Sequence, residues 1–96
     1  MGDVEIMTLF DRTVLPAYSH AESGGQALFI PTRQPKRGKV GWLIDHRIER
    51  LMATAHRLGV RAVVVDRAHL HGQYILLRGV PLERAMNEAK SPELAL

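Results

Sequence analysis

The chain has 96 residues, of which 46% are apolar and 24% are charged, so it has room for a single domain around one hydrophobic core. It contains no cysteine, which excludes a disulfide scaffold, thiolate catalysis and cysteine-ligated zinc, and which fits a reducing compartment. No segment approaches the roughly 18 apolar residues that a membrane-spanning helix needs, so we expect no membrane partner.

The formal net charge of +3 is concentrated in the middle third of the chain. Residues 33–67 carry nine cations and three acids, whereas residues 1–32 carry one cation and four acids. Such an asymmetry favours a polyanionic partner more strongly than the total charge does. The first residues, MGDVEIMTLF, contain acids where a signal peptide carries positive charge, so we expect a cytoplasmic protein.

The first 26 residues are predicted to form a strand followed by a Gly-rich loop. Val4 to Phe10 has the apolar content of a strand. Tyr18 to Gln26 reads YSHAESGGQ, and its polar residues and paired glycines predict a loop. Within this single domain of residues 1–96, we expect an α+β core over residues 27–90 and a frayed tail over 91–96.

A second strand and a long helix are predicted next. Ala27 to Ile30 is a short apolar run that Pro31 ends. From Gly41 the apolar residues recur at steps of three and four, which is typical of one helix face. That face comprises Ile44, Ile48, Leu51, Met52, Ala55 and Leu58. Gly59 is the predicted stop, because glycine readily adopts the left-handed conformation that ends helices.

Two more strands and a helix complete the predicted fold. The runs RAVVVDR, from Arg61, and QYILLRG, from Gln73, are separated by AHLHG, which predicts a hairpin. Pro81 lies near the first turn of a final helix, where its missing N–H costs nothing. The predicted order is β-β-α-β-β-α, an α+β fold in which two helices cover a small mixed sheet.

The order of these segments resembles that of a known domain. The segments are ALFI, TRQPKR, IDHRIERLMATAHRLGV, RAVVV, GQYILLRG and LERAMNEA. From Leu28 to Ala89 they resemble the N-terminal domain of ParB, the plasmid and chromosome partition protein, whose fold is shared with sulfiredoxin. The resemblance implies a ParB/sulfiredoxin-like topology for about two-thirds of the chain.

The phosphate-binding signature of that family is only partly present. In ParB a Gly-Glu-Arg-Arg box at the start of the last helix helps to hold nucleotide phosphates. Gly79, Arg84 and Ala85 match the family pattern, whereas residues 80–82, Val-Pro-Leu, replace the acid and both arginines. The catalytic cysteine of sulfiredoxin has no counterpart. The resemblance therefore implies a topology more than it implies nucleotide turnover.

A basic stretch, IPTRQPKRGKVGW from Ile30 to Trp42, is a candidate phosphate-binding segment. Two prolines restrain it, which lowers the entropy lost on binding, and each phosphate contact would release counterions and make the affinity salt-dependent. The alternative interpretation is a solvated connection whose cations only aid solubility. The candidate side chains are Arg33, Lys36, Arg37 and Lys39.

Arginines of the predicted long helix extend this candidate surface. At about 100° per residue, Arg47, Arg50 and Arg57 fall in one arc beside the apolar face. They would continue the surface that the basic stretch begins. The alternative is a solvated helix face, with Asp45 and Glu49 as local carboxylate partners.

His69 and His71 are weak candidates for a metal site. Alternate residues of an extended segment point the same way, so both imidazoles would face one ion, with Asp66 nearby. No spacing rule supplies a third ligand from the remaining histidines. A polar hairpin tip with exposed histidines is therefore the favoured interpretation, and we expect no cofactor.

Two functional hypotheses follow from these features. The first is a small non-catalytic regulator that binds DNA or RNA through the phosphate backbone, using the basic stretch and the helix arginines. The alternative is a protein-binding inhibitor or accessory subunit, of the phage or plasmid type, that docks its basic face on an acidic protein surface. An exposed sheet edge would also allow a homodimer. No nucleophile elbow, Gly-rich phosphate loop or HExxH motif is present, so an enzyme is the least favoured class.

Overall fold

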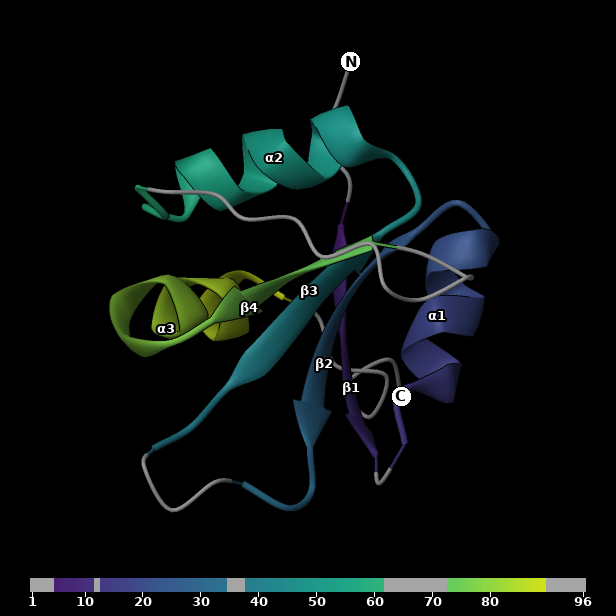
Figure 1. The fold of residues 1–96 in the computed structure, drawn as a ribbon, viewed down its shortest axis with the longest axis horizontal. Coiled ribbons are helices and arrows are strands. Elements are labelled where there is room, and N and C mark those ends of the chain that lie inside the picture. Colours follow the sequence, from purple (N-terminus) through teal and green to yellow (C-terminus); the bar gives the residue numbers. More distant parts are fainter. Residues whose placement is uncertain (1–4, 12, 35–37, 62–72, 90–96) are drawn as a thin grey trace.

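The computed structural model describes residues 5–11, 13–34, 38–61 and 73–89. Within these ranges the chain forms a four-stranded sheet with helices packed on both faces (Figure 1). The strands are β1 (Ile6–Asp11), β2 (Gln26–Pro31), β3 (Gly41–Asp45) and β4 (Gln73–Leu77). The helices are α1 (Leu15–Glu22), α2 (Ile48–Arg57) and α3 (Gly79–Glu88).

The strands lie in the order β1-β2-β3-β4, and the sheet is mixed. β1 and β2 run parallel, with Ile6 opposite Gln26, whereas β3 is antiparallel to both β2 and β4. A parallel pair needs a crossover connection, and α1 lies in the connection between β1 and β2. The predicted α+β class with a small mixed sheet is confirmed.

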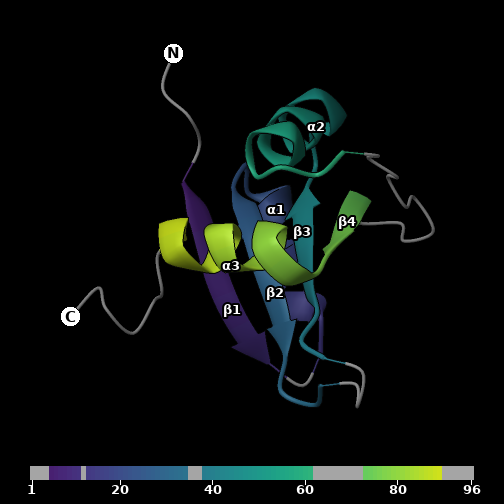
Figure 2. The ribbon, with the colours of Figure 1, turned by 90° about the vertical axis from the view of Figure 1, so that its left-hand side faces the viewer.

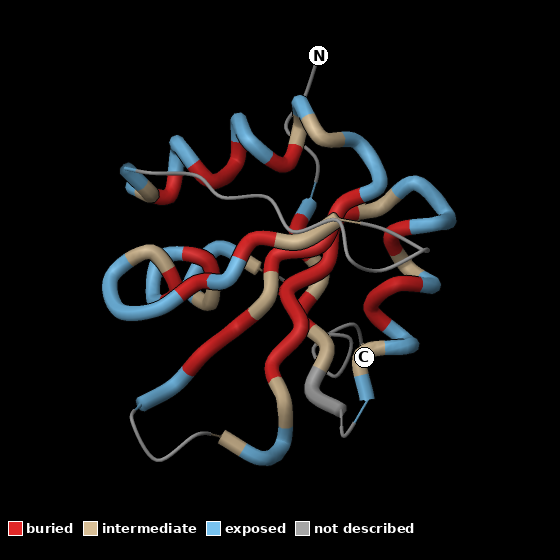
Figure 3. Tube along the Cα trace, viewed as in Figure 1, coloured by how far each residue is buried: buried red, intermediate tan, exposed pale blue. Residues whose placement is uncertain are grey.

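Helices cover the sheet from two sides, which gives the domain two hydrophobic clusters. Figure 2 shows α2 and α3 on the near face, with α3 crossing β2 and β1, and α1 behind the sheet. In β2, Leu28 and Ile30 face α2 and α3, whereas Ala27 and Phe29 face α1. Because both faces are covered, this strand is buried at five successive positions (Figure 3). Burial on both faces explains why residues 27–30 are continuously apolar rather than alternating.

The prediction of a Gly-rich loop over residues 18–26 is wrong for most of this segment, because residues 18–22 belong to α1. Pro16 lies in the first turn of this helix, and Ala17, Tyr18 and Ala21 form its buried side. Ser19 and Glu22 on the other side are exposed, and these polar residues gave the segment the composition of a loop. The turn itself begins later, where Gly24 has a φ of 102°.

The predicted start of the long helix is also wrong, because residues 41–45 form β3. Trp42 of this strand pairs with Phe29 of β2 on one side and with Leu76 of β4 on the other. Ile44 consequently packs against α1 and not on a helix face. A Cβ at Gly41 would lie 2.6 Å from Leu82 Cδ1, so this glycine allows α3 to approach the strand closely.

The observed order over the described residues is β-α-β-β-α-β-α, which corrects the predicted β-β-α-β-β-α. The helices α2 and α3 are confirmed, and Gly59 after α2 has the expected positive φ, 95°. The strand predicted from Arg61 and its hairpin turn fall almost entirely within residues 62–72, outside the described part of the chain.

Candidate anion-binding surface

The arginine at the centre of α2 is held by an internal carboxylate. Arg50 donates from Nε to Asp45 Oδ2 at 2.6 Å and from Nη2 to Oδ1 at 2.7 Å, a bidentate pair. Asp45 is fully buried at the end of β3. The hydrogen bond to Asp45 raises the pKa of Arg50 above its ordinary value. Arg50 is therefore committed to holding α2 against the sheet.

Two further side chains complete this group, which we call the Asp45 cluster (Asp45, Arg50, Gln26 and Thr54). Gln26 Nε2 donates to Asp45 Oδ2 and to Thr54 Oγ1, each at 3.0 Å. The backbone N–H of Arg47 donates to Asp45 Oδ1 at 2.9 Å. A carboxylate has about four acceptor positions, and the carboxylate of Asp45 receives four donors. It is thus fully occupied in joining β2, β3 and α2.

The last arginine of α2 is also paired. Arg57 Nη1 lies 2.5 Å from Glu88 Oε2 of α3, and both side chains are about 38% exposed. Nearby, Arg84 donates to the carbonyl of Leu58 at 3.4 Å. Of the three arginines predicted on this helix, only Arg47 is exposed and without an ion pair among the described residues.

The described cations of the predicted basic surface do not lie together, because those of the β2–β3 connection and those around α2 lie at opposite ends of β3 (Figure 1). The connection between β2 and β3 carries Arg33 and Lys39 at one end of the sheet. Arg47 follows β3 at the other end, after a strand of five residues that spans on the order of 16 Å. Residues 41–45 were predicted to begin the helix but form β3 instead. This extended strand separates the cations before it from those after it. Lys36 and Arg37 lie outside the described residues.

The β2–β3 connection is tied across its two described ends by Gln34. The Gln34 side chain donates to the carbonyl of Pro31 at 2.8 Å, and its Oε1 accepts the N–H of Val40 at 2.9 Å. Arg33 and Lys39 flank this tie, and both are exposed. Neither side chain is paired with a carboxylate among the residues that the structure describes. No sequence pattern indicated this role of Gln34.

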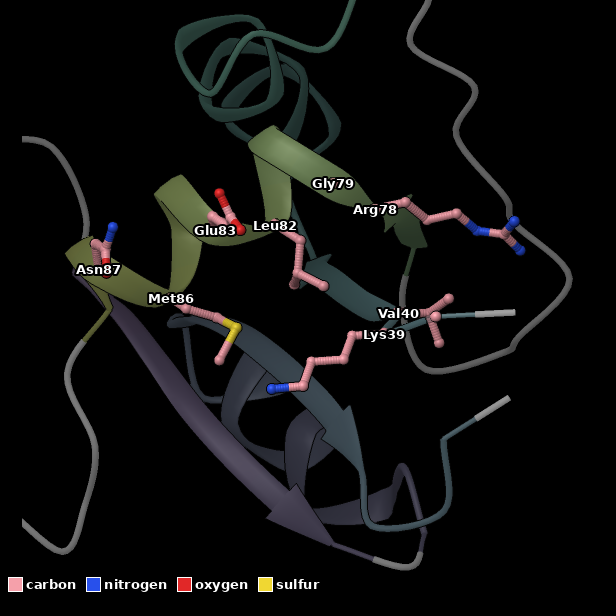
Figure 4. A pocket seen from close by; sticks show the side chains of 9 residues that line it. Lys39, Val40, Arg78, Gly79, Leu82, Glu83, Met86 and Asn87 are labelled. Atoms are coloured by element: carbon pink, nitrogen blue, oxygen red, sulfur yellow. The ribbon is translucent and has the colours of Figure 1, made fainter. Parts of the chain in front are cut away.

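A pocket of about 720 Å³ lies between the end of this connection and the start of α3 (Figure 4). Lys39 and Val40 line one side, and Leu82 and Met86 line the other. Figure 4 shows Lys39 extending beneath Met86, whereas Arg78 extends away from them at the beginning of the helix. We call the three exposed cations Arg33, Lys39 and Arg78 the loop-end surface.

Arg78 and the pocket were not predicted from the sequence, although one local signal was present. Arg78 is the N-cap of α3, where no side chain caps the helix and no acid occupies the first turn. The backbone N–H groups at such a terminus carry partial positive charge. The Gly79–Pro81 segment indicates where this helix starts. The helix start lies beside Lys39 because of the way in which α3 crosses the sheet, which the local sequence does not show.

The candidate metal ligands His69 and His71 lie outside the described residues. Within the described ranges, no three histidine, aspartate or glutamate side chains are grouped as a metal site. None of the helices in these ranges has the length and apolar run of a membrane-spanning segment.

No family model, curated protein or solved structure matches this chain. The resemblance to the ParB/sulfiredoxin-like domain therefore stays a prediction.

Proposed function

We propose that this protein is a small non-catalytic, nucleic-acid-associated regulator that contacts backbone phosphates with its loop-end surface. The observation that supports this most directly is that Arg33 and Lys39 are exposed and unpaired among the described residues. Gln34 fixes the two ends of the connection relative to each other. Two more cations, Lys36 and Arg37, lie between them in the sequence.

A cation contributes to phosphate binding when it is not already neutralised. Arg50 would have to leave a buried carboxylate, and removing one partner from such a pair is strongly unfavourable. We therefore assign no phosphate contact to Arg50. Phosphate contacts of this kind give affinity and register but little discrimination between bases.

The test is a salt titration of DNA and RNA binding by fluorescence anisotropy, between about 50 and 200 mM salt. We expect the affinity for a duplex to fall steeply, with the logarithmic slope reduced by about 0.9 for each phosphate contact removed. Arg33→Gln and Arg78→Gln should each reduce the slope. Arg47→Gln is the matched control, since it removes the same charge from the opposite end of the sheet. Affinity that is flat with salt, or an equal loss in all three variants, would contradict the proposal.

A protein-binding role is the second candidate, and two exposed apolar side chains favour it. Leu76 on β4 and Val80 on α3 are 42% and 57% exposed, and they flank Arg78 in the sequence. An arginine between apolar residues is typical of protein interfaces. The partner would be an acidic protein surface, with this chain as inhibitor or accessory subunit. Val80→Gln separates the two roles: it should weaken a stoichiometric, nuclease-resistant protein complex and leave nucleic-acid affinity unchanged.

Three further parts of the proposal concern location, catalysis and oligomeric state. A cytoplasmic location is supported by the absence of cysteine. A non-enzymatic role is supported by the lack of a recognised catalytic motif. A homodimer is supported by β1, which lies at one edge of the described sheet. Light scattering coupled to size-exclusion chromatography measures the oligomeric state directly.

A further inference from the structure

We infer that the pocket beneath α3 binds a small organic monoanion with an apolar body. This site goes beyond nucleic-acid binding and does not depend on it, although Lys39 belongs to both surfaces. The anionic group of the ligand would meet the Lys39 ammonium, and its apolar body would lie against Leu82 and Met86.

The size and walls of the pocket fit a small organic molecule. Its volume of about 720 Å³ lies within the range of roughly 300–1,000 Å³ that is usual for small-molecule sites. Val40 and Leu82 are buried residues of its wall, and Met86 is partly buried and packs against the main core cluster. Methionine adapts its shape readily, so this wall can adjust to ligands of differing width.

The polar groups at the pocket select an anion. Figure 4 shows the Lys39 side chain running beneath Met86, so its ammonium lies beside the apolar wall. Lys39 has no carboxylate or hydrogen-bond partner among the described residues. The start of α3 has neither a capping side chain nor an acid in its first turn, which favours negative charge nearby.

The balance of charge favours one negative charge over several. Lys39 is the cation whose side chain runs along the apolar wall, whereas the Arg78 side chain extends away from this wall; Glu83 is an acid in the same lining. A single ammonium beside the apolar wall matches a ligand with one negative charge, such as a carboxylate or sulfonate. A polyphosphate would face Glu83 with several uncompensated charges, and like charges at short range are unfavourable.

The experiment uses the full chain and three probe compounds, followed by ¹H–¹⁵N and methionine methyl NMR spectra. Octanoate carries both an anionic group and an apolar body, octyltrimethylammonium has the same body with the opposite charge, and acetate has the anionic group alone. We expect octanoate to give saturable shifts at Lys39, Val40, Leu82 and Met86. Octyltrimethylammonium should bind about tenfold more weakly or worse, as for the loss of one charge-assisted contact, and acetate should give no saturable shift.

Two variants and a control locate the site. Lys39→Gln should weaken octanoate binding about tenfold, and Met86→Gln should weaken it by a similar factor through loss of apolar contact. Arg33→Gln removes a cation outside the pocket lining and should leave octanoate binding unchanged. The spectra of the unliganded variants report whether each variant is folded. The comparison of the three probe compounds uses the unmodified chain, so it tests the inference even if a variant does not fold.

Three results would overturn the inference: no saturable shift with octanoate, equal binding of the cationic compound, or shifts confined to residues outside the pocket. These outcomes are separable from failure of the nucleic-acid proposal. Met86→Gln should lower octanoate affinity and leave nucleic-acid affinity intact. Arg33→Gln should lower nucleic-acid affinity and leave octanoate affinity intact.

Discussion

The end of the sheet that leads into α2 and the end that carries the β2–β3 connection hold their cations in different ways. At the α2 end, Arg50 is paired with a buried carboxylate that also binds Gln26. At the other end, Arg33 and Lys39 are exposed and unpaired among the described residues, and the tie beside them is the neutral side chain of Gln34. The same residue type therefore supports the fold at one end and remains available to a ligand at the other. Charge in the sequence indicates binding only where the fold leaves it unpaired.

The largest effect is expected at the Asp45 cluster. Asp45→Ala removes the acceptor of four hydrogen bonds and leaves the Arg50 guanidinium without its carboxylate. We expect a loss of about 3–5 kcal/mol in the free energy of unfolding, as for breaking other buried pairs. Urea denaturation followed by Trp42 fluorescence measures it. Glu49→Ala is the control, since Glu49 is exposed on the same helix, and a loss below about 1 kcal/mol for Asp45→Ala would show that the cluster does not stabilise the fold.

A packing change tests how the other end of the sheet is held. Gly41→Ala places a Cβ 2.6 Å from Leu82 Cδ1 and 3.2 Å from Leu28 Cδ1. We expect a loss of about 1–3 kcal/mol, since extra volume in a packed core forces side chains from their preferred positions. The double variant with Leu82→Ala should be less destabilised than the sum of the two single variants. Strict additivity in thermal or urea unfolding would contradict a close approach of α3 to β3.

A smaller effect is expected at Gln34, and it bears on binding as well as on stability. Gln34→Ala removes both hydrogen bonds across the β2–β3 connection and should cost about 1 kcal/mol of unfolding free energy. It changes no charge, so any loss of nucleic-acid affinity reports lost ordering of Arg33 and Lys39. Thr32→Ala is a suitable control, because Thr32 is exposed in the same connection. If stability and affinity both stay at the level of this control, the tie has no effect on the surface.

The smallest effect is expected at the ion pair between Arg57 and Glu88. Both side chains are exposed by more than a third, and solvent screens pairs of this kind. A double-mutant cycle with Arg57→Gln and Glu88→Gln should give a coupling below about 1 kcal/mol that decreases as salt is added. A coupling comparable to that of the Asp45 cluster would remove the contrast between an arginine paired with a buried carboxylate and an arginine in an exposed ion pair.

Several elements were predictable from local sequence because each has a strong local signal. The buried run of β2 is apolar at successive positions, and α3 has Pro81 in its first turn. The start of β3 was not predictable in this way. Its apolar residues, Trp42 to Ile44, suit either a helix or a strand, and only pairing with β2 and β4 selects the strand. Likewise, α1 has a buried side of only Ala17, Tyr18 and Ala21, too few for a clear period.

The sequence by itself determined the α+β class, the position of the two later helices and the excess of positive charge between residues 33 and 67. Only the tertiary structure decided which of those charges are available. Asp45 and Arg50 are close in sequence, but the Gln26 contact and the burial of the carboxylate depend on β2 lying beside β3. The pocket likewise exists because α3 crosses the sheet next to Lys39. Periodicity and composition are local properties of a chain, whereas the pairing and burial of a charge depend on residues that folding brings together.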